Sequence, residues 1–191
     1  MWSLSLWNHE MLPLQWGVVA GASLAAAVFD ISSHKIPNRL TAPLFASGLV
    51  WAVLAAGLAG LADATVACLL LAFPFVLLFL FAGGGAGDAK LMGALGAWLG
   101  IVNGLVVLTA VCVAGVVLAV CFSLAKRRFR TAWANVATVA RTFSLVALSR
   151  VKLRDVGAMF PKVNEMQTMP YGIAIFSGVT AAAIGVFLWH F

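Results

Sequence analysis

Six apolar runs of membrane-spanning length make up most of this chain and restrict it to helical membrane folds. A helix needs about 20 apolar residues to cross a hydrocarbon core of about 30 Å, and the chain is 63% apolar and only 9% charged. In lipid every backbone polar group needs an internal partner, which an α-helix supplies. The runs are 14–29, 43–61, 65–82, 89–102, 104–125 and 171–189. We predict an all-α membrane protein with six transmembrane helices, forming a single domain over residues 1–191.

The fourth run, 89–102, is the shortest, and its 14 residues would rise only about 21 Å as a helix. A re-entrant segment is the alternative, but the basic residues indicate that this run crosses the bilayer. Cytoplasmic loops carry an excess of Lys and Arg. With six crossings and the N-terminus outside, all twelve basic residues lie on the cytoplasmic side. They are Lys35, Arg39, Lys90 and the nine between Lys126 and Lys162. Without a fourth crossing, the basic cluster after the fifth run would lie on the opposite side.

The segment at about 126–168 joins the fifth and sixth runs and is too polar to be a span. Arg141 lies in its most apolar part and would cost about 2.5 to 3.5 kcal/mol at the centre of a membrane helix. Polar side chains recur in it at helical spacing, and apolar side chains largely occupy the other faces. We predict a basic amphipathic helix in the cytoplasmic interface, near anionic headgroups. Anchoring is its simpler role, and substrate contact is the alternative.

Two of the six carboxylates are candidates for chemistry. Asp30 ends the first run and Asp88 opens the fourth, so both lie at the cytoplasmic boundary, where an ionisable group is costly. Two neighbouring carboxylates cannot both ionise, so one stays protonated while the other activates a water, which suits peptide hydrolysis. The structural alternatives are helix capping by Asp88 and an ion pair of Asp30 with Lys35 or Arg39. Asp63, just before the third run, is predicted to be an N-cap.

Each of the two aspartates lies in a distinctive local pattern. Asp88 belongs to a G-x-G-D-x-K pattern formed with Gly85, Gly87 and Lys90. Its glycines lack a Cβ atom and let an extended peptide approach closely. The loop does not match a phosphate-binding G-x-x-x-x-G-K-[ST] motif.

An I-P-N turn follows Asp30. Its Pro37 and Asn38 are expected to fix the chain before the second run.

These two patterns, with the Met169–Gly172 start of the last run, resemble the prepilin peptidase family of intramembrane aspartic proteases. The resemblance implies that Asp30 and Asp88 are catalytic. It implies removal of the leader peptide from type IV (Flp-like) prepilins at the cytoplasmic face of the bacterial inner membrane. We assign a substrate-binding or supporting role to Gly85, Gly87, Lys90, Pro37 and Asn38.

The chain is similar to the short, peptidase-only members tied to tight-adherence (Flp-type) pilus assembly. Its three cysteines form no C-x-x-C pair and no N-terminal methyltransferase region precedes the first run, so methyltransferase activity is not expected. The expected partners are a prepilin and membrane lipid, without nucleic acid. No cofactor and no metal are expected, because no His, Cys and carboxylate cluster is apparent.

Helix dipoles favour Asp88, at a helix N-terminus, as the anion and Asp30, near a helix C-terminus, as the acid. The alternative function is a proton- or cation-coupled transporter that uses the same carboxylates. A non-catalytic membrane scaffold is a third class. A transporter usually has sites near the midplane and paired repeats, whereas both aspartates lie at one boundary, which favours the protease.

Overall fold

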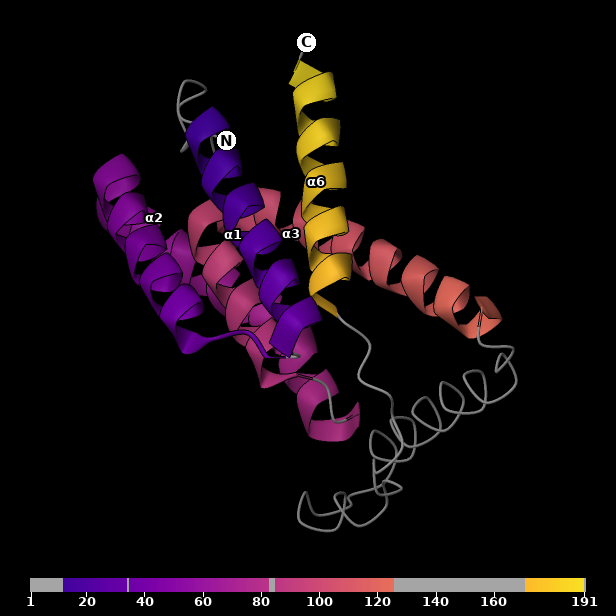
Figure 1. The fold of residues 1–191 in the computed structure, drawn as a ribbon. Coiled ribbons are helices and arrows are strands. Elements are labelled where there is room, and N and C mark those ends of the chain that lie inside the picture. The colour runs from indigo at the N-terminus through magenta and orange to yellow at the C-terminus, as the bar shows by residue number, and fades with distance from the viewer. Residues whose placement is uncertain (1–11, 34, 83–84, 126–170, 191) are drawn as a thin grey trace, which may run out of the picture.

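The computed structural model describes residues 12–33, 35–82, 85–125 and 171–190, and the description below concerns these residues. They form four helices, all long and apolar enough to cross a membrane, and no strand is present among them (Figure 1). The helices are α1 (Leu12–Ser33), α2 (Asn38–Ala82), α3 (Ala86–Ala125) and α6 (Tyr171–His190). The prediction of an all-α membrane protein is confirmed. The predicted interfacial helix at 126–168 lies outside the described residues.

Helix α2 is divided into two parts by a break near its middle. The helix has 45 residues, about twice what one crossing needs. Its backbone leaves the helical conformation at Ala56 and Gly57, where Gly57 has a φ of 60° that suits a residue without a Cβ atom. In a straight helix, Ala52 and Gly60 would be separated by about 12 Å along the axis. Here they are so close that a Cβ atom on Gly60 would collide with the carbonyl oxygen of Ala52. The chain therefore reverses direction at this break.

A second break divides α3, which has 40 residues, at Gly100, whose φ is 69°. The second part of the helix begins at the next residue, and the backbone N–H of Ile101 donates a hydrogen bond of 3.3 Å to Oδ2 of Asp63. The first N–H groups of a helix have no partner within it, so this contact caps the second part of α3. The prediction that Asp63 caps its own helix is therefore wrong. Asp63 lies inside the second part of α2 and caps a neighbouring helix.

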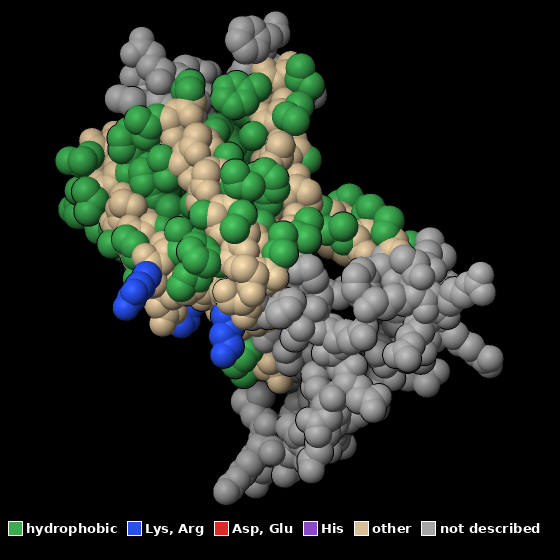
Figure 2. Space-filling model, in the orientation of Figure 1, with side chains coloured by type: hydrophobic (Ala, Val, Ile, Leu, Met, Phe, Trp, Pro, Cys, Tyr) green, Lys and Arg blue, Asp and Glu red, His purple; other side chains and the backbone are tan. Residues whose placement is uncertain are grey.

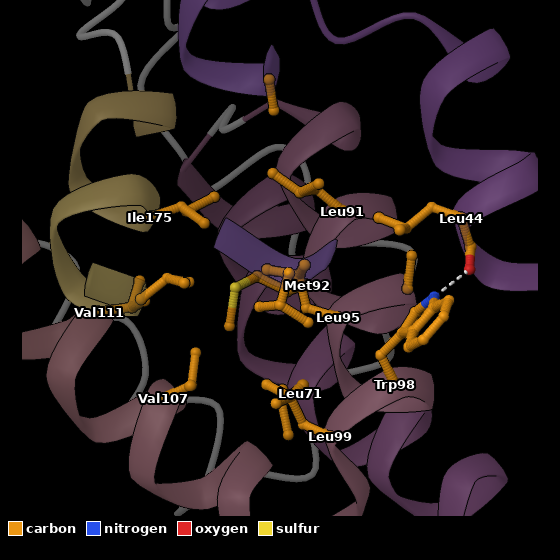
Figure 3. Close-up of a cluster of buried hydrophobic side chains, with 14 of the residues drawn as sticks. Leu44, Leu71, Leu91, Met92, Leu95, Trp98, Leu99, Val107, Val111 and Ile175 are labelled. Carbon is orange, nitrogen blue, oxygen red and sulfur yellow. Dashed lines mark hydrogen bonds between the residues drawn. The ribbon is translucent and has the colours of Figure 1, made fainter. Parts of the chain in front are cut away.

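The first part of α3 is the centre of the bundle. All residues from 91 to 100 are buried, with α2 packed against α3 and α6 also in contact with it. Figure 3 shows the core cluster, in which side chains of α2, α3 and α6 meet. The labelled members from α3 include Leu91, Met92, Leu95 and Leu99, which lie near Leu71 of α2 and Ile175 of α6. In a membrane such helices associate through close packing, because lipid is as apolar as the side chains.

Glycines set how closely α2 and α3 approach. A Cβ atom on Gly96 would lie 2.7 Å from the carbonyl oxygen of Ala67, and one on Gly93 would lie 3.2 Å from Sγ of Cys68. These two glycines therefore allow α2 and α3 to pack closely. Gly100 instead breaks α3.

Trp98 fastens the first part of α2 to α3. Its indole N–H donates a hydrogen bond of 2.8 Å to the carbonyl oxygen of Leu44, which Figure 3 marks with a dashed line. Its ring stacks on that of Trp51, with the ring centroids 5.8 Å apart. This hydrogen bond and the stacking fix the two helices against each other within the core.

Helix α1 packs mainly against α6 and makes few contacts with α2, its neighbour in sequence. Helix α6 also packs against α3, so the last helix of the chain provides much of the contact between α1 and the rest of the bundle. In Figure 1 the C-terminal end of α1 and the N-terminal ends of α3 and α6 lie at the same end of the bundle. The candidate site is at this end.

Candidate active site

Asp30 and Asp88 line one pocket at an end of the bundle. Asp30 lies one turn before the C-terminus of α1, and Asp88 lies in the first turn of α3. Their side chains are 8% and 9% exposed, and the pocket has a volume of about 300 Å³. Two carboxyl groups 58 positions apart in the sequence thus open onto the same small cavity.

Three chain segments form the wall of this pocket: the end of α1, the loop into α2 and the start of α3. The lining residues are Asp30, Lys35, Ile36, Asn38, Gly85, Ala86, Gly87, Asp88 and Lys90. They include the predicted supporting residues except Pro37, and they add Lys35, Ile36 and Ala86. The two motifs identified in the sequence therefore meet in space.

Pro37 lies between two residues that line the pocket, and its carbonyl group caps the start of α2. Its carbonyl oxygen accepts the backbone N–H groups of Leu40 and Thr41 at 3.0 and 3.4 Å. These bonds begin α2 and satisfy N–H groups that have no partner within the helix. Pro37 thus fixes where α2 starts and, with it, the position of Asn38.

Two direct contacts join the I-P-N turn to the start of α3. Nζ of Lys90 donates a hydrogen bond of 2.9 Å to the side-chain oxygen of Asn38. At Gly87, an added Cβ atom would lie 3.0 Å from Cβ of Ile36, so the two backbones approach as closely as a glycine permits. The motif that follows Asp30 is thereby held against the motif that contains Asp88.

Gly85 determines the space available to the carboxyl group of Asp88. Its carbonyl oxygen accepts the backbone N–H of Asp88 at 3.1 Å, which closes the first turn of α3. A Cβ atom on Gly85 would lie only 2.8 Å from Oδ2 of Asp88. The side chain of Asp88 therefore folds back over the glycine that precedes the helix.

Asp30 is held from a third direction by the last helix. The backbone N–H of Gly172, in the first turn of α6, donates a buried hydrogen bond of 2.7 Å to Oδ2 of Asp30. The only signal in the sequence is the Pro-Tyr-Gly pattern at the start of the last run. This pattern does not indicate that the amide of Gly172 contacts Asp30.

The described basic residues gather at the pocket end of the bundle. Lys35 and Lys90 line the pocket, and Arg39 lies one residue beyond Asn38. Figure 2 shows their blue side chains at one end, beyond a surface that is largely apolar. Asp63, the other described carboxylate, lies beside the break at Gly100, at the other end of the first part of α3.

Comparison with known proteins supplies the family. The profile of the type IV leader peptidase family matches residues 17–120, more than half of the chain, and this range contains both aspartates. A prepilin leader peptidase/N-methyltransferase of Aeromonas hydrophila is 36% identical over 97 residues, which cover 44% of this chain and 33% of that protein. The chain thus spans about a third of the length of that relative, and no solved structure matches it. The protein belongs to the type IV leader peptidase family.

Proposed function

We propose that this protein is an intramembrane aspartic endopeptidase that removes the leader peptide from type IV (Flp-like) prepilins. The observation that carries the proposal is that Asp30 and Asp88 line one pocket in a member of the leader peptidase family. Both side chains are largely buried, and water-poor surroundings keep one of two neighbouring carboxyl groups protonated. A pair in this state has the base and the acid that peptide hydrolysis needs.

In the proposed reaction, the ionised aspartate takes a proton from a water molecule whose oxygen attacks the scissile carbonyl carbon. The protonated aspartate gives its proton to the carbonyl oxygen, and a tetrahedral diol forms. The C–N bond then breaks: one hydroxyl of the diol returns its proton to the second aspartate, and the leaving amine takes the proton held by the first. Both aspartates end in their starting states. The start of α3 favours Asp88 as the ionised partner, and the end of α1 favours Asp30 as the acid.

Residues around the dyad are proposed to receive the extended substrate. Gly85 and Gly87 leave room for a peptide backbone beside Asp88, because neither has a side chain. Lys90 and Asn38, joined by their hydrogen bond, border the same pocket, and Pro37 holds Asn38 in place. In this proposal Asp30 and Asp88 are the catalytic residues and the other five are substrate-binding or supporting.

The proposed topology has six crossings, with the N-terminus outside and the pocket facing the cytoplasm. The reversal at Gly57 and the break at Gly100 support two crossings each for α2 and α3, whose straight lengths would be about 68 and 60 Å. A hydrocarbon core is about 30 Å thick. Lys35 and Lys90 at the pocket agree with a cytoplasmic position. The membrane proposed is the bacterial inner membrane.

Cleavage of a purified, full-length Flp-type prepilin in detergent tests the proposal. Asp30→Asn and Asp88→Asn should each reduce the rate by about a thousandfold or more, with normal amounts of inserted protein. Asp63→Asn, which changes a carboxylate far from the pocket, should cleave at the normal rate. Near-normal cleavage by either of the first two variants would exclude the dyad.

Two further experiments test the transporter alternative and the expected absence of methyltransferase activity. A transporter would move protons or cations in vesicles and leave the prepilin intact, and the family match lends this alternative no support. The relative from Aeromonas hydrophila has N-methyltransferase in its name, whereas here we expect an unmodified amino group on the product. Mass spectrometry of the new N-terminus, with a methyl donor present, tests this expectation.

A further inference from the structure

The hydrogen bond between Gly172 and Asp30 joins the start of α6 to the end of α1 at the candidate site. The backbone N–H of Gly172 lies 2.7 Å from Oδ2 of Asp30, and the bond is buried. A hydrogen bond to a carboxyl group in such surroundings is stronger than one in water. It occupies one oxygen of Asp30 and thereby orients the other.

The helices approach so closely here that only glycine fits at position 172. A Cβ atom would lie 2.9 Å from Cβ of Asp30, 3.0 Å from Cα of Ala27 and 3.1 Å from Oδ2 of Asp30. Two of these three neighbours are backbone or the base of a side chain, so they cannot turn away. A larger residue would move the start of α6 away from α1 and stretch the hydrogen bond.

We propose that Gly172 is a positioning residue for the proteolytic reaction: its amide holds Oδ2 of Asp30 so that Oδ1 carries the reacting proton. This inference rests on the proposed function. With Asp30 protonated, Oδ2 is the carbonyl oxygen that accepts the N–H of Gly172, and the proton lies on the opposite oxygen. The amide thus selects which oxygen of Asp30 meets the substrate carbonyl. The selection matters for the transition state and not for binding of the leader.

A purely structural reading of the same contact is that Asp30 caps α6. The first N–H groups of a helix need acceptors, and a carboxyl group from another helix can supply one. Capping alone predicts that loss of the contact lowers stability and leaves the turnover of the folded enzyme unchanged. Positioning predicts a lower kcat at nearly constant KM, because the interaction contributes only in the transition state.

Steady-state cleavage of a purified Flp-type prepilin by Gly172→Ala separates the two readings. We expect kcat to fall about 10- to 100-fold, with KM within twofold of the parent value. Two glycines of the same helix provide controls. Gly185→Ala adds a methyl group to open space, and Gly178→Ala crowds the backbone of Val111 without touching either aspartate. Gly178→Ala should lower the melting temperature and Gly185→Ala should not, and both should keep the parent kcat.

A kcat of Gly172→Ala within twofold of the parent, or a loss confined to KM, would overturn the positioning role. So would an equal loss of kcat in Gly178→Ala. A measurement that needs no activity applies even if Gly172→Ala does not accumulate. In protein labelled with nitrogen-15 glycine, the amide proton of Gly172 should shift upfield and exchange faster in Asp30→Ala. An unchanged resonance would overturn the contact.

Failure of this inference is distinct from failure of the proposed function. If Asp30→Asn and Asp88→Asn abolish cleavage while Gly172→Ala cleaves normally, the dyad stands and only the positioning role falls. If the two aspartate variants cleave normally, the protease proposal itself fails, whatever the glycine variants do.

Discussion

Lys90 on α3 donates a hydrogen bond of 2.9 Å to the side-chain oxygen of Asn38 at the start of α2. Because this contact joins the two aspartate motifs, we expect Lys90→Met and Asn38→Ala each to lower the cleavage rate by about two- to tenfold, the contribution of one exposed hydrogen bond. The double variant should be no slower than the slower single variant, since both changes remove the same interaction. Rates of the three variants on one prepilin test this coupling. Losses that multiply would show that the two residues act separately.

Gly85→Ala should separate activity from stability. The added Cβ atom would lie 2.8 Å from Oδ2 of Asp88, and this side chain can turn without moving the backbone. We therefore expect an unchanged melting temperature and a cleavage rate about 10- to 100-fold lower, the effect of displacing a reacting group. Gly21→Ala, where the methyl group would meet no atom within 4 Å, is the matched control. A Gly85→Ala enzyme with the parent rate would show that the Asp88 carboxyl group tolerates displacement.

Asp63→Ala should lower stability without affecting the reaction. The substitution removes the acceptor for the N–H of Ile101, and loss of a helix cap costs about 0.5 to 2 kcal/mol. Asp63→Asn keeps a side-chain oxygen and should retain most of the stability. Thermal unfolding in detergent, with cleavage assayed at a temperature where all proteins are folded, tests both statements. A lower kcat for Asp63→Ala would contradict the position assigned to this residue.

The stacked pair of Trp98 and Trp51 offers an internally controlled test of one core hydrogen bond. Trp98→Phe removes the donor to Leu44 and should cost about 1 kcal/mol of unfolding free energy beyond the change in packing. The indole nitrogen of Trp51 is also buried but has no hydrogen-bond partner among the described residues. Trp51→Phe should therefore cost less. Equal losses in the two variants would assign the stabilisation to ring packing alone.

The apolar runs predicted that the described residues are helical and apolar enough to cross a membrane, because spanning length and the absence of charge are local properties of the sequence. They predicted six separate helices, whereas the described residues form four, and α2 and α3 each contain two of the predicted runs. The positions of the breaks were predicted less well. The apolar runs place the boundaries between helices at 62–64 and at 103, whereas the chain breaks at Ala56–Gly57 and at Gly100. Positive φ angles at glycines determine these breaks. Asp63 misled the prediction because its partner, Ile101, is 38 positions away.

The sequence predicts most residues of the candidate site but not the hydrogen bond that joins Asp30 to α6. The motifs around Asp30 and Asp88 predicted five supporting residues, and all of them except Pro37 line the pocket. Lys35, Ile36 and Ala86 also line the pocket, although the sequence analysis assigns none of them a role in the site. The amide of Gly172 could not be found in this way, since a backbone group leaves no signature in a sequence and its partner is 142 positions away.

The dependence of α1 on α6 has a consequence for biosynthesis. Asp30 leaves the ribosome 142 residues before Gly172, which at about 5 to 20 residues per second takes about 7 to 30 s. During that time α1 has been made, while α6, the helix that contacts it most, has not. A nascent chain therefore holds Asp30 without its backbone donor until the start of α6 has been made.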